Sequence, residues 1–445
     1  MEMRKKKGDR LDSEICRNTI WRLATYSRLT VVLLQYIFNI LIADHNAEGV
    51  FISPILRHED TTAVGCVITH LLGGFLRWDA QYFLHIFKYG YTYENTLAFF
   101  PFYPYTVRLL TSYVPGNSVT VFLVAGVVLN NIIFIVTAVI LFDLTLSMHR
   151  NAVFAYNSAV LFCLNPASIF FSAPYSESLF AFATFHGMYS ILNDQICRAS
   201  MFFGISAMTR SNGILNVGFF LYIMIHSAVK KNKIMLKGFL GLCFVLLCFS
   251  FFQIYSYYKY CISQEPIQDI DVIEFANKNN LLMPNNQTML SWCGNRLAYS
   301  YVQDKYWNVG FLRYFQIKQI PNFILASPCI FVILNFGFKY FLNNVHALIN
   351  LGKGKPEFPY IVHAVFLTIF CLFFIHVQVT TRMLASSSPV LYWASAYYFK
   401  FPIFLKRKLA FSCIFNDKNS SFIFLYFISY FLFGTILFVN FLPFT

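Results

Sequence analysis

Ionisable side chains occur at four places beside long apolar stretches of this 445-residue chain. Such groups are costly in lipid and usually mark function. Arginines suit a phosphate through bidentate, charge-assisted bonds, and a nearby carboxylate suits a general base that takes a proton from a hydroxyl. Fixed positive charges would also stabilise a leaving phosphate. The four groups are Arg77-Trp78-Asp79, Tyr175-Ser176-Glu177, Arg210 with Asn212, and Gln378 with Arg382. Together they favour transfer of a sugar from a lipid phosphate to a hydroxyl acceptor.

The elements that must position these groups follow from composition. The chain is 57% hydrophobic and 19% aromatic, and only 12% of its residues are charged. Ordinary globular chains contain about 25% charged residues. Apolar runs of about 20 residues, long enough to cross a bilayer, recur along nearly the whole chain. We therefore expect an all-α polytopic membrane protein, because a β-barrel would show short alternating segments instead.

The apolar runs predict ten membrane spans, and two further segments are ambiguous. Residues 97–113 are broken by Pro101 and Pro104, and 198–209 is only a dozen residues long. Both the N-terminus and the lysine-rich stretch near 230 are expected to be cytosolic, so one of the two segments must span. We favour 198–209, because this choice gathers the four polar groups on one face. Either choice predicts about eleven spans; the ten are near 24–43, 119–143, 152–171, 175–195, 212–228, 238–258, 320–340, 358–378, 383–399 and 421–442.

The net charge of +14 reports topology rather than nucleic-acid binding. Basic residues cluster near the N-terminus, at 230–237 and at 400–408, and short basic loops mark the cytosolic side. Residues 44–96 hold six acids against three Lys/Arg, and 259–306 hold five against four. We therefore expect a cytosolic basic segment, 1–23, followed by a single membrane domain, 24–445. Two large loops would lie on the non-cytosolic side: the first loop (44–96) and the second loop (259–306). The first apolar run lacks a small-residue cleavage site and is interpreted as an uncleaved span.

The second loop carries three further signals. Cys261 and Cys293 bracket it and could form a disulfide in an oxidising lumen. Asn286-Gln287-Thr288 is a glycosylation sequon on a suitable side. Asp269-Ile270-Asp271 matches the DxD pattern of metal-dependent glycosyltransferases, but two acids at this spacing occur often by chance. We predict no obligatory metal. A glycine-rich phosphate loop is also missing from the sequence, which fits a lipid-phosphate donor better than a nucleotide.

Several stretches resemble the GPI mannosyltransferase 2 family over nearly the whole chain, from about residue 20 to the end. They are "WDAQYFLHIFKYGYTYENTLAFFPFYP", "NPASIFFSAPYSESLFA", "RSNG", "YSYVQDKYWNVGFLRYFQIKQIPNFILASP", "HVQVTTRMLASSSP" and "FLPFT". The resemblance implies a GT-C glycosyltransferase fold in the endoplasmic reticulum membrane, with a lumenal active site. It also implies transfer of the second mannose of the GPI anchor precursor from dolichyl-phosphate mannose, in α-1,6 linkage with inversion. The resemblance implies no cofactor. It does imply a small membrane partner subunit, which some lineages of the family require.

The resemblance places the key acid at Asp79, directly after Trp78, and Glu94 in the same loop could exchange roles with it as the base. The substrate-binding residues that we predict are Trp78, Glu94, Glu177, Arg210, Asn212, Gln378 and Arg382. Structural alternatives stand beside these roles. Asp79 could pair with Arg77, Glu177 could stabilise a helix N-terminus, and either of the two other arginines could reach toward lipid head groups.

Two other classes of protein, and one other enzyme of the same class, compete with this interpretation. A secondary transporter would use the same residue types near the bilayer midplane, but it should show two related halves. No internal repeat is visible in the sequence. A non-catalytic scaffold would tolerate Asp79→Asn, and another GT-C mannosyltransferase would act on a different acceptor. His85 and His376 have no neighbouring metal ligands in the sequence and are expected to be hydrogen-bonded packing residues.

Overall fold

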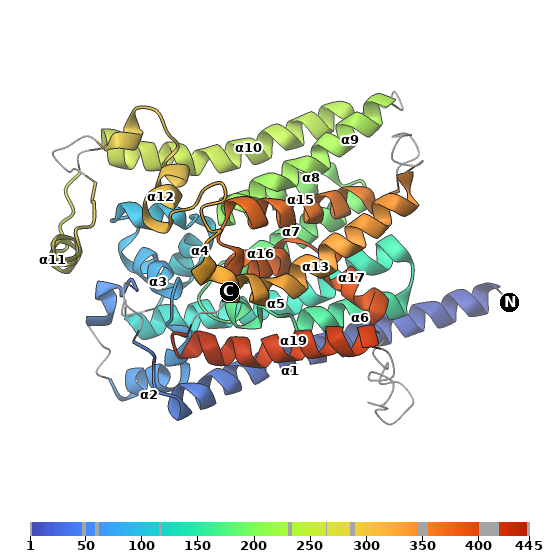
Figure 1. Cartoon of the computed structure of the whole chain (residues 1–445), viewed down its shortest axis with the longest axis horizontal. Coiled ribbons are helices and arrows are strands. Elements are labelled where there is room, and N and C mark those ends of the chain that lie inside the picture. Colours follow the sequence, from blue (N-terminus) through green and yellow to red (C-terminus); the bar gives the residue numbers. More distant parts are fainter. Residues whose placement is uncertain are drawn as a thin grey trace.

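The computed structural model describes residues 2–46, 50–57, 62–114, 118–229, 234–263, 265–284, 290–345, 355–399 and 418–442, with side chains from residue 13 onward. Every regular element in these ranges is helical (Figure 1). The all-α prediction is therefore confirmed for this part of the chain. Asn286 and the basic residues at 230–233 and 400–408 lie outside the described residues.

The main helices of the first half of the chain are α1 (Glu2–Leu41), α2 (Ala63–Leu72), α3 (Ala80–Tyr89), α4 (Phe102–Thr111), α5 (Val119–His149), α6 (Ala152–Cys163), α7 (Glu177–Leu192), α8 (Ile196–Thr209) and α9 (Val217–Val229). Those of the second half are α10 (Met235–Tyr257), α11 (Ile270–Asn279), α12 (Ala298–Trp307), α13 (Ile320–Asn343), α15 (Phe358–Phe374), α16 (Thr380–Ser387), α17 (Val390–Tyr398) and α19 (Lys418–Val439).

Four helical stretches within these ranges are long and apolar enough to cross a membrane: Val119–His149, Met235–Ile262, Ile317–Asn343 and Lys418–Val439. The chain is therefore a multi-pass membrane protein. Several other expected spans are shorter apolar helices, so the number of about eleven stays a prediction. Most of the first expected span, 24–43, lies within α1, whose backbone is helical from Glu2.

Two of the expected spans are interrupted beside a proline. In the run at 152–171, α6 ends at Cys163, and the 3-10 turn η4 (Ser168–Phe171) follows Asn165-Pro166. In the run at 383–399, Pro389 separates α16 from α17. Proline lacks the N–H that a helix interior requires and disfavours helical geometry in the residue before it. The helical breaks at these two places follow from the prolines, and whether each run crosses the membrane stays a prediction.

The two ambiguous segments are both helical and differ in their surroundings. The ten-residue helix α4 packs against α3 and α5. The fourteen-residue helix α8 packs along both α7 and α10 and is a full member of the bundle. Figure 1 shows α8 among the long helices and α4 close to α3.

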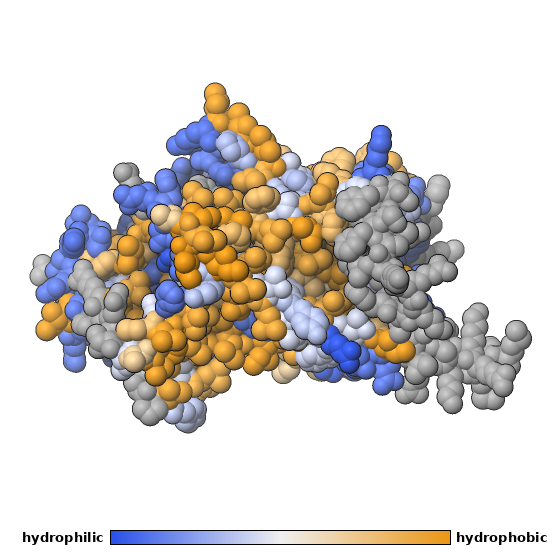
Figure 2. Space-filling model, turned by 90° about the horizontal axis from the view of Figure 1, so that it is seen from below, coloured by the Kyte–Doolittle hydropathy of each residue, from blue (hydrophilic) through white to orange (hydrophobic). Residues whose placement is uncertain are grey.

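The two large loops gather at one end of the helical bundle. Figure 1 places α2 and α3 of the first loop, and α11 and α12 of the second, far from the N-terminal end of α1. A disulfide between Cys261 and Cys293 joins the two ends of the second loop, with the Cα atoms 5.8 Å apart. Figure 2 shows a broad hydrophobic area over the middle of one face, whereas hydrophilic residues gather near the loop end. This arrangement is expected of helices surrounded by lipid, with loops in water.

Candidate active site

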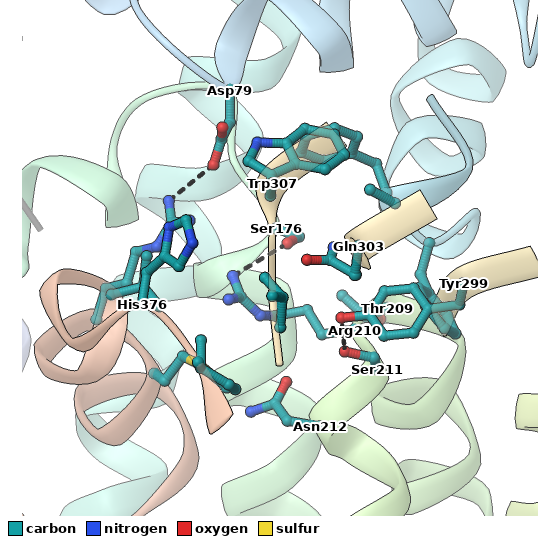
Figure 3. Close-up of a pocket in the computed structure, with 18 of the residues that line it drawn as sticks. Asp79, Ser176, Thr209, Arg210, Ser211, Asn212, Tyr299, Gln303, Trp307 and His376 are labelled. Atoms are coloured by element: carbon teal, nitrogen blue, oxygen red, sulfur yellow. Dashed lines mark hydrogen bonds and ion pairs between the residues drawn. The ribbon is translucent and has the colours of Figure 1, made fainter. Parts of the chain in front are cut away.

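A cavity of about 500 Å³ lies where the two loops meet the helical bundle (Figure 3). Its walls come from the start of α3, the start of α7, the end of α8, α12 and the segment between α15 and α16. The charged and polar residues that line it are Asp79, Ser176, Glu177, Thr209, Arg210, Ser211, Asn212, Tyr299, Ser300, Gln303, His376 and Arg382. Five of the predicted site residues, from four distant parts of the chain, therefore surround one space.

Two carboxylates and two guanidinium groups form a connected chain along the cavity. Arg382 NH1 donates to Asp79 Oδ2 at 2.9 Å, and Arg382 Nε lies 3.8 Å from Glu177 Oε1. Arg210 NH1 donates to the same Glu177 oxygen and lies 3.5 Å from Ser176 Oγ. The formal charges of the four groups sum to zero. Because the site has no net positive charge, it can bind a substrate anion only through direct contacts between that anion and the guanidinium groups.

The two carboxylates have different access to the cavity. The side chain of Asp79 is 25% exposed, whereas that of Glu177 is fully buried. Within the described part of the chain, Glu177 Oε2 and Arg382 Nε are buried and have no hydrogen-bond partner. Buried polar groups normally have partners, so unpaired groups require an explanation. One donor and one acceptor of this charged group are therefore left without a hydrogen-bond partner among the described residues.

The position of Asp79 depends on an unusual backbone turn. Trp78 has a φ of +55°, a left-handed conformation that bulky residues rarely adopt. Asp79 then begins α3 as its N-cap, but its side chain makes no capping hydrogen bond. Aspartate in this position normally caps the helix, and here the carboxylate reaches Arg382 instead. Tyr175 fixes the turn from the other side, because its hydroxyl accepts a hydrogen bond from Asp79 N at 3.0 Å and donates to Arg77 O at 3.2 Å.

The segment that carries Tyr175 and Glu177 is held by a buried asparagine. Asn130 Nδ2 donates to the backbone oxygens of Ala173 and Tyr175. Glu177 is the first residue of α7, where a negative charge is favourable to the helix dipole. The predicted structural alternative for Glu177 is therefore compatible with its place in the cavity. Arg382 lies 5.2 Å from the ring centre of Phe170 and 5.9 Å from that of Tyr175, close enough for cation–π contacts.

One wall of the cavity was missed by the sequence analysis. Tyr299, Gln303 and Trp307 are spaced four residues apart, so they lie on one face of α12, and all three line the cavity. Ser211 Oγ donates to the hydroxyl of Tyr299 at 2.7 Å, which ties this face to the end of α8 (Figure 3). The four-residue spacing was the available signal, because it predicts a polar and aromatic helix face. Its direction could not be inferred without the fold.

Three predicted site residues do not line the cavity. The indole of Trp78 packs against Phe441, with ring centres 5.7 Å apart. Gln378 accepts a hydrogen bond from the Tyr314 hydroxyl at 3.1 Å, and neither residue lines the cavity. Glu94 is fully buried elsewhere. Substrate contact by Trp78, Gln378 and Glu94 therefore stays a prediction, and the structure places their side chains outside the cavity lining.

Glu94 joins the two loops to each other. Its carboxylate accepts hydrogen bonds from Trp292 Nε1 at 2.9 Å, Lys305 Nζ at 2.6 Å and the Tyr306 hydroxyl at 2.8 Å. Burial and the neighbouring carboxylate of Glu94 raise the pKa of Tyr306, so the phenol remains a donor. These three partners belong to the second loop, and two of them are on α12. Glu94 therefore holds the α12 wall in place, and this contact explains a buried carboxylate away from the cavity.

The remaining titratable residues singled out in the sequence have local roles. His85 is buried and contacts Thr92 Oγ1 at 2.6 Å, and burial lowers the pKa of His85 to about 3. His376 lines the cavity and stacks on Tyr314. Asp269 caps α11 by accepting from Val272 N. No group of three metal-ligating side chains was found in the described ranges of the chain.

The fold and the cavity define a class of protein: a multi-pass helical membrane protein with a charged site at the loop end of its bundle. Comparison with known sequences gives the family. The profile of the mannosyltransferase (PIG-V) family matches residues 17–445. GPI mannosyltransferase 2 of Drosophila pseudoobscura pseudoobscura is 34% identical, over 96% of this chain and 99% of its own length. Human GPI alpha-1,6-mannosyltransferase 2 is 32% identical, over 96% and 99% of the two chains. The chain belongs to the PIG-V mannosyltransferase family and is therefore a glycosyltransferase.

Among solved structures, this chain is similar to the archaeal oligosaccharyltransferase AglB from Archaeoglobus fulgidus. The TM-score is 0.45 and the sequence identity 11%, with 94% of this chain covered. The match spans just over half of the AglB chain, 56% of its length.

Proposed function

We propose that this protein transfers a mannose from dolichyl-phosphate mannose to the GPI anchor precursor, in α-1,6 linkage and with inversion at the anomeric carbon. The linkage and acceptor follow the names of the relatives that match nearly the whole chain. The observation that carries the proposal is the ion pair between the partly exposed Asp79 and Arg382, beside Glu177 and Arg210. A lipid-phosphate donor needs cations at the phosphate, and a hydroxyl acceptor needs a base.

In the proposed reaction, an acceptor hydroxyl attacks the anomeric carbon of mannose from the face opposite the dolichyl phosphate. The oxygen–carbon bond forms as the carbon–phosphate-oxygen bond breaks, and Asp79 takes the hydroxyl proton. Arg382 and Arg210 stabilise the negative charge that develops on the leaving dolichyl phosphate. Protonation of Asp79 removes the negative charge that partly neutralises Arg382. The positive charge of Arg382 is then more available to the phosphate at the moment it is needed.

The geometry favours Asp79 over the other two acids as the base. Glu177 is fully buried, and one of its oxygens is occupied by Arg210, so an acceptor hydroxyl has poor access to it. Glu94 lies outside the cavity and accepts three hydrogen bonds from the second loop. Asp79 combines cavity access with a neighbouring cation. The role of Trp78 in the proposal is to shape the turn before Asp79 rather than to touch the sugar.

We also place the site on the lumenal face of the endoplasmic reticulum membrane. Support comes from the position of the two loops, which lie at the end of the bundle far from the N-terminal end of α1. The basic N-terminal segment is expected in the cytosol by the positive-inside rule, so the loops would face the lumen. The disulfide between Cys261 and Cys293 is compatible with an oxidising compartment.

The test uses microsomes that lack the endogenous enzyme and contain either this protein or its Asp79→Asn variant at equal abundance. They receive labelled dolichyl-phosphate mannose and the one-mannose GPI precursor, and the lipid products are separated. Asparagine is nearly isosteric but cannot accept the proton, so we expect a loss of about 10²–10⁴-fold in rate. Full activity of the variant would refute the assignment of the base. A folded but inactive wild type would refute the substrate, unless adding the small partner subunit implied by the resemblance restores activity.

The same assay tests whether a metal ion is required. We propose that the arginines alone supply the positive charge at the phosphate, so EDTA should leave the initial rate unchanged within about twofold. A reaction that stops with EDTA and resumes with Mg²⁺ or Mn²⁺ would assign that role to a metal instead.

A further inference from the structure

The end of α19 contacts the segment that presents Asp79, although the two are separated by more than 350 residues in sequence. Arg77 Nε donates to Val439 O at 2.8 Å, and the Arg77 guanidinium lies 4.6 Å from the ring centre of Phe441. The ring centres of Trp78 and Phe441 are 5.7 Å apart, and the ring planes meet at 61°, in an edge-to-face contact. Both residues before Asp79 are therefore held by α19 and the turn that follows it.

The approach of the two segments is close. A Cβ atom added to Gly74, just before the turn, would lie 2.9 Å from Val439 Cγ1 and 2.6 Å from Gln35 Oε1. Such a distance leaves no room for a side chain, so glycine permits this contact. On the far side of the turn, the backbone amide of His45 donates to Asn440 O at 3.0 Å. The end of α19 is thus fixed to the first loop at several independent points.

The contact falls on strained backbone. Trp78 and Phe441 have φ values of +55° and +56°, and both are bulky residues in the left-handed region. Such conformations persist only where the surroundings impose them. The two strained residues face each other, so each ring holds the other backbone in its unfavourable conformation. Trp78 sets the direction in which the chain enters α3 and hence the direction of the Asp79 carboxylate.

The end of α19 also contacts the opposite wall of the site. The ring of Phe438 lies 5.7 Å from that of Tyr175 and 5.3 Å from that of Phe170. Tyr175 accepts a hydrogen bond from Asp79 N, and both aromatic residues lie beneath the Arg382 guanidinium. One helix end therefore supports both partners of the Asp79–Arg382 ion pair.

We infer that Phe441, together with Phe438 and Val439, is a positioning element that holds the Asp79 carboxylate at the distance required for catalysis. The inference rests on the proposed function, in which Asp79 is the base. Phe441 touches neither the cavity nor the substrate, and it acts through Trp78 and Arg77. A displacement of about 1 Å at a reacting group can cost up to about a hundredfold in rate. Loss of this support should therefore appear in kcat rather than in substrate affinity.

The test compares Phe441→Ala with Phe433→Ala in the full-length protein. Phe433 lies on α19, the helix that precedes Phe441, and is 62% exposed, so its substitution by alanine removes the same ring from a position that faces away from the site. We expect Phe441→Ala to lower kcat about tenfold to a hundredfold, with the KM values for donor and acceptor within about twofold. Phe441→Tyr keeps the ring and should restore kcat. Hydrogen exchange should become faster for the amides of 80–83 in Phe441→Ala, because these amides bond to the strained turn, but not in Phe433→Ala.

Each outcome decides the inference. Equal kcat values and equal exchange for the two alanine variants would overturn it. Faster exchange without a loss of kcat, or a loss that tyrosine does not restore, would also overturn it. A wild type that stays inactive even with the partner subunit would instead refute the proposed function. The exchange of the amides of 80–83 alone would then decide whether Phe441 holds the turn. In that case the positioning role of Phe441 is supported only if Phe441→Ala, and not Phe433→Ala, speeds the exchange of these amides.

Discussion

Glu94 provides a sharp test of the difference between a supporting and a catalytic acid in the first loop. In the structure it accepts hydrogen bonds from Trp292, Lys305 and Tyr306 and lies outside the cavity. The change Glu94→Gln keeps the shape of the side chain and removes its charge. We expect the variant to loosen the second loop and to leave the chemical step nearly intact.

The expected magnitude follows from the contacts. In the better orientation of the new amide, its oxygen still accepts from Trp292, and its NH₂ group faces Lys305 and Tyr306. The Tyr306 hydroxyl can rotate to accept a hydrogen bond. Lys305 is 33% exposed and can turn to water. The net loss is one charge-assisted hydrogen bond, about 1.5–3 kcal/mol, which corresponds to an increase of about 10- to 150-fold in local opening of α12.

The assay is hydrogen exchange of peptides that cover α12, combined with initial rates per folded molecule. Because Tyr299, Gln303 and Trp307 of α12 line the cavity, the KM values should rise, whereas kcat should fall less than about tenfold. Asp79→Asn is the matched control: it should reduce kcat without affecting exchange in α12. If Glu94→Gln reduces kcat as much as Asp79→Asn and leaves the exchange of α12 within about threefold, the supporting role is refuted and Glu94 is the base.

Two further predictions concern the loops. Changing Cys261 and Cys293 to serine removes a cross-link with a sequence separation of 32. We expect the free energy of unfolding to fall by about 3–4 kcal/mol, so that thermal inactivation occurs at a lower temperature. Thermal inactivation unchanged from wild type would refute this prediction. Burial lowers the pKa of His85 to about 3, so His85 binds a proton more tightly in the unfolded chain than in the folded protein. The free energy of unfolding therefore decreases as the pH falls from about 6.5 toward 3. Between pH 7.5 and 5.5 the loss is about 1.3 kcal/mol, and His85→Gln should reduce the pH dependence of thermal inactivation; an unchanged dependence would contradict the assignment to His85.

The sequence predicted which polar groups would meet, because charge in an apolar chain is informative. Asp79, Glu177, Arg210, Asn212 and Arg382 were all selected because isolated polar groups beside apolar runs are costly, and all five surround the cavity. The helical class followed from composition for a similar reason, since a backbone in lipid must satisfy its own hydrogen bonds. These inferences depend on the surrounding solvent and not on the details of packing.

The side-chain placements that the sequence did not predict depended on packing details. Gln378 and Arg382 are four residues apart, but a 3-10 turn, η10 (Val377–Val379), precedes α16 and turns Gln378 toward Tyr314. Helical spacing alone would have placed both on one face. The direction of Trp78 was equally hidden, because its left-handed backbone lies against Phe441, in the turn that follows α19. Such contacts join residues hundreds of positions apart, and no local pattern reports them.

The arrangement of charges explains why two acids occur in the cavity when the proposed reaction needs one base. Two guanidinium groups close enough to contact the same phosphate repel each other, and their burial is costly without counter-charges. Glu177 is fully buried and contacts both arginines through one oxygen, so it holds them together before a substrate arrives. Asp79 contacts only the outer face of this group, through Arg382, and remains open to the cavity. Glu177, which offsets the cost of burying two guanidinium groups, is thus buried away from the acceptor. Asp79, which can exchange a proton, is the acid that is open to the cavity.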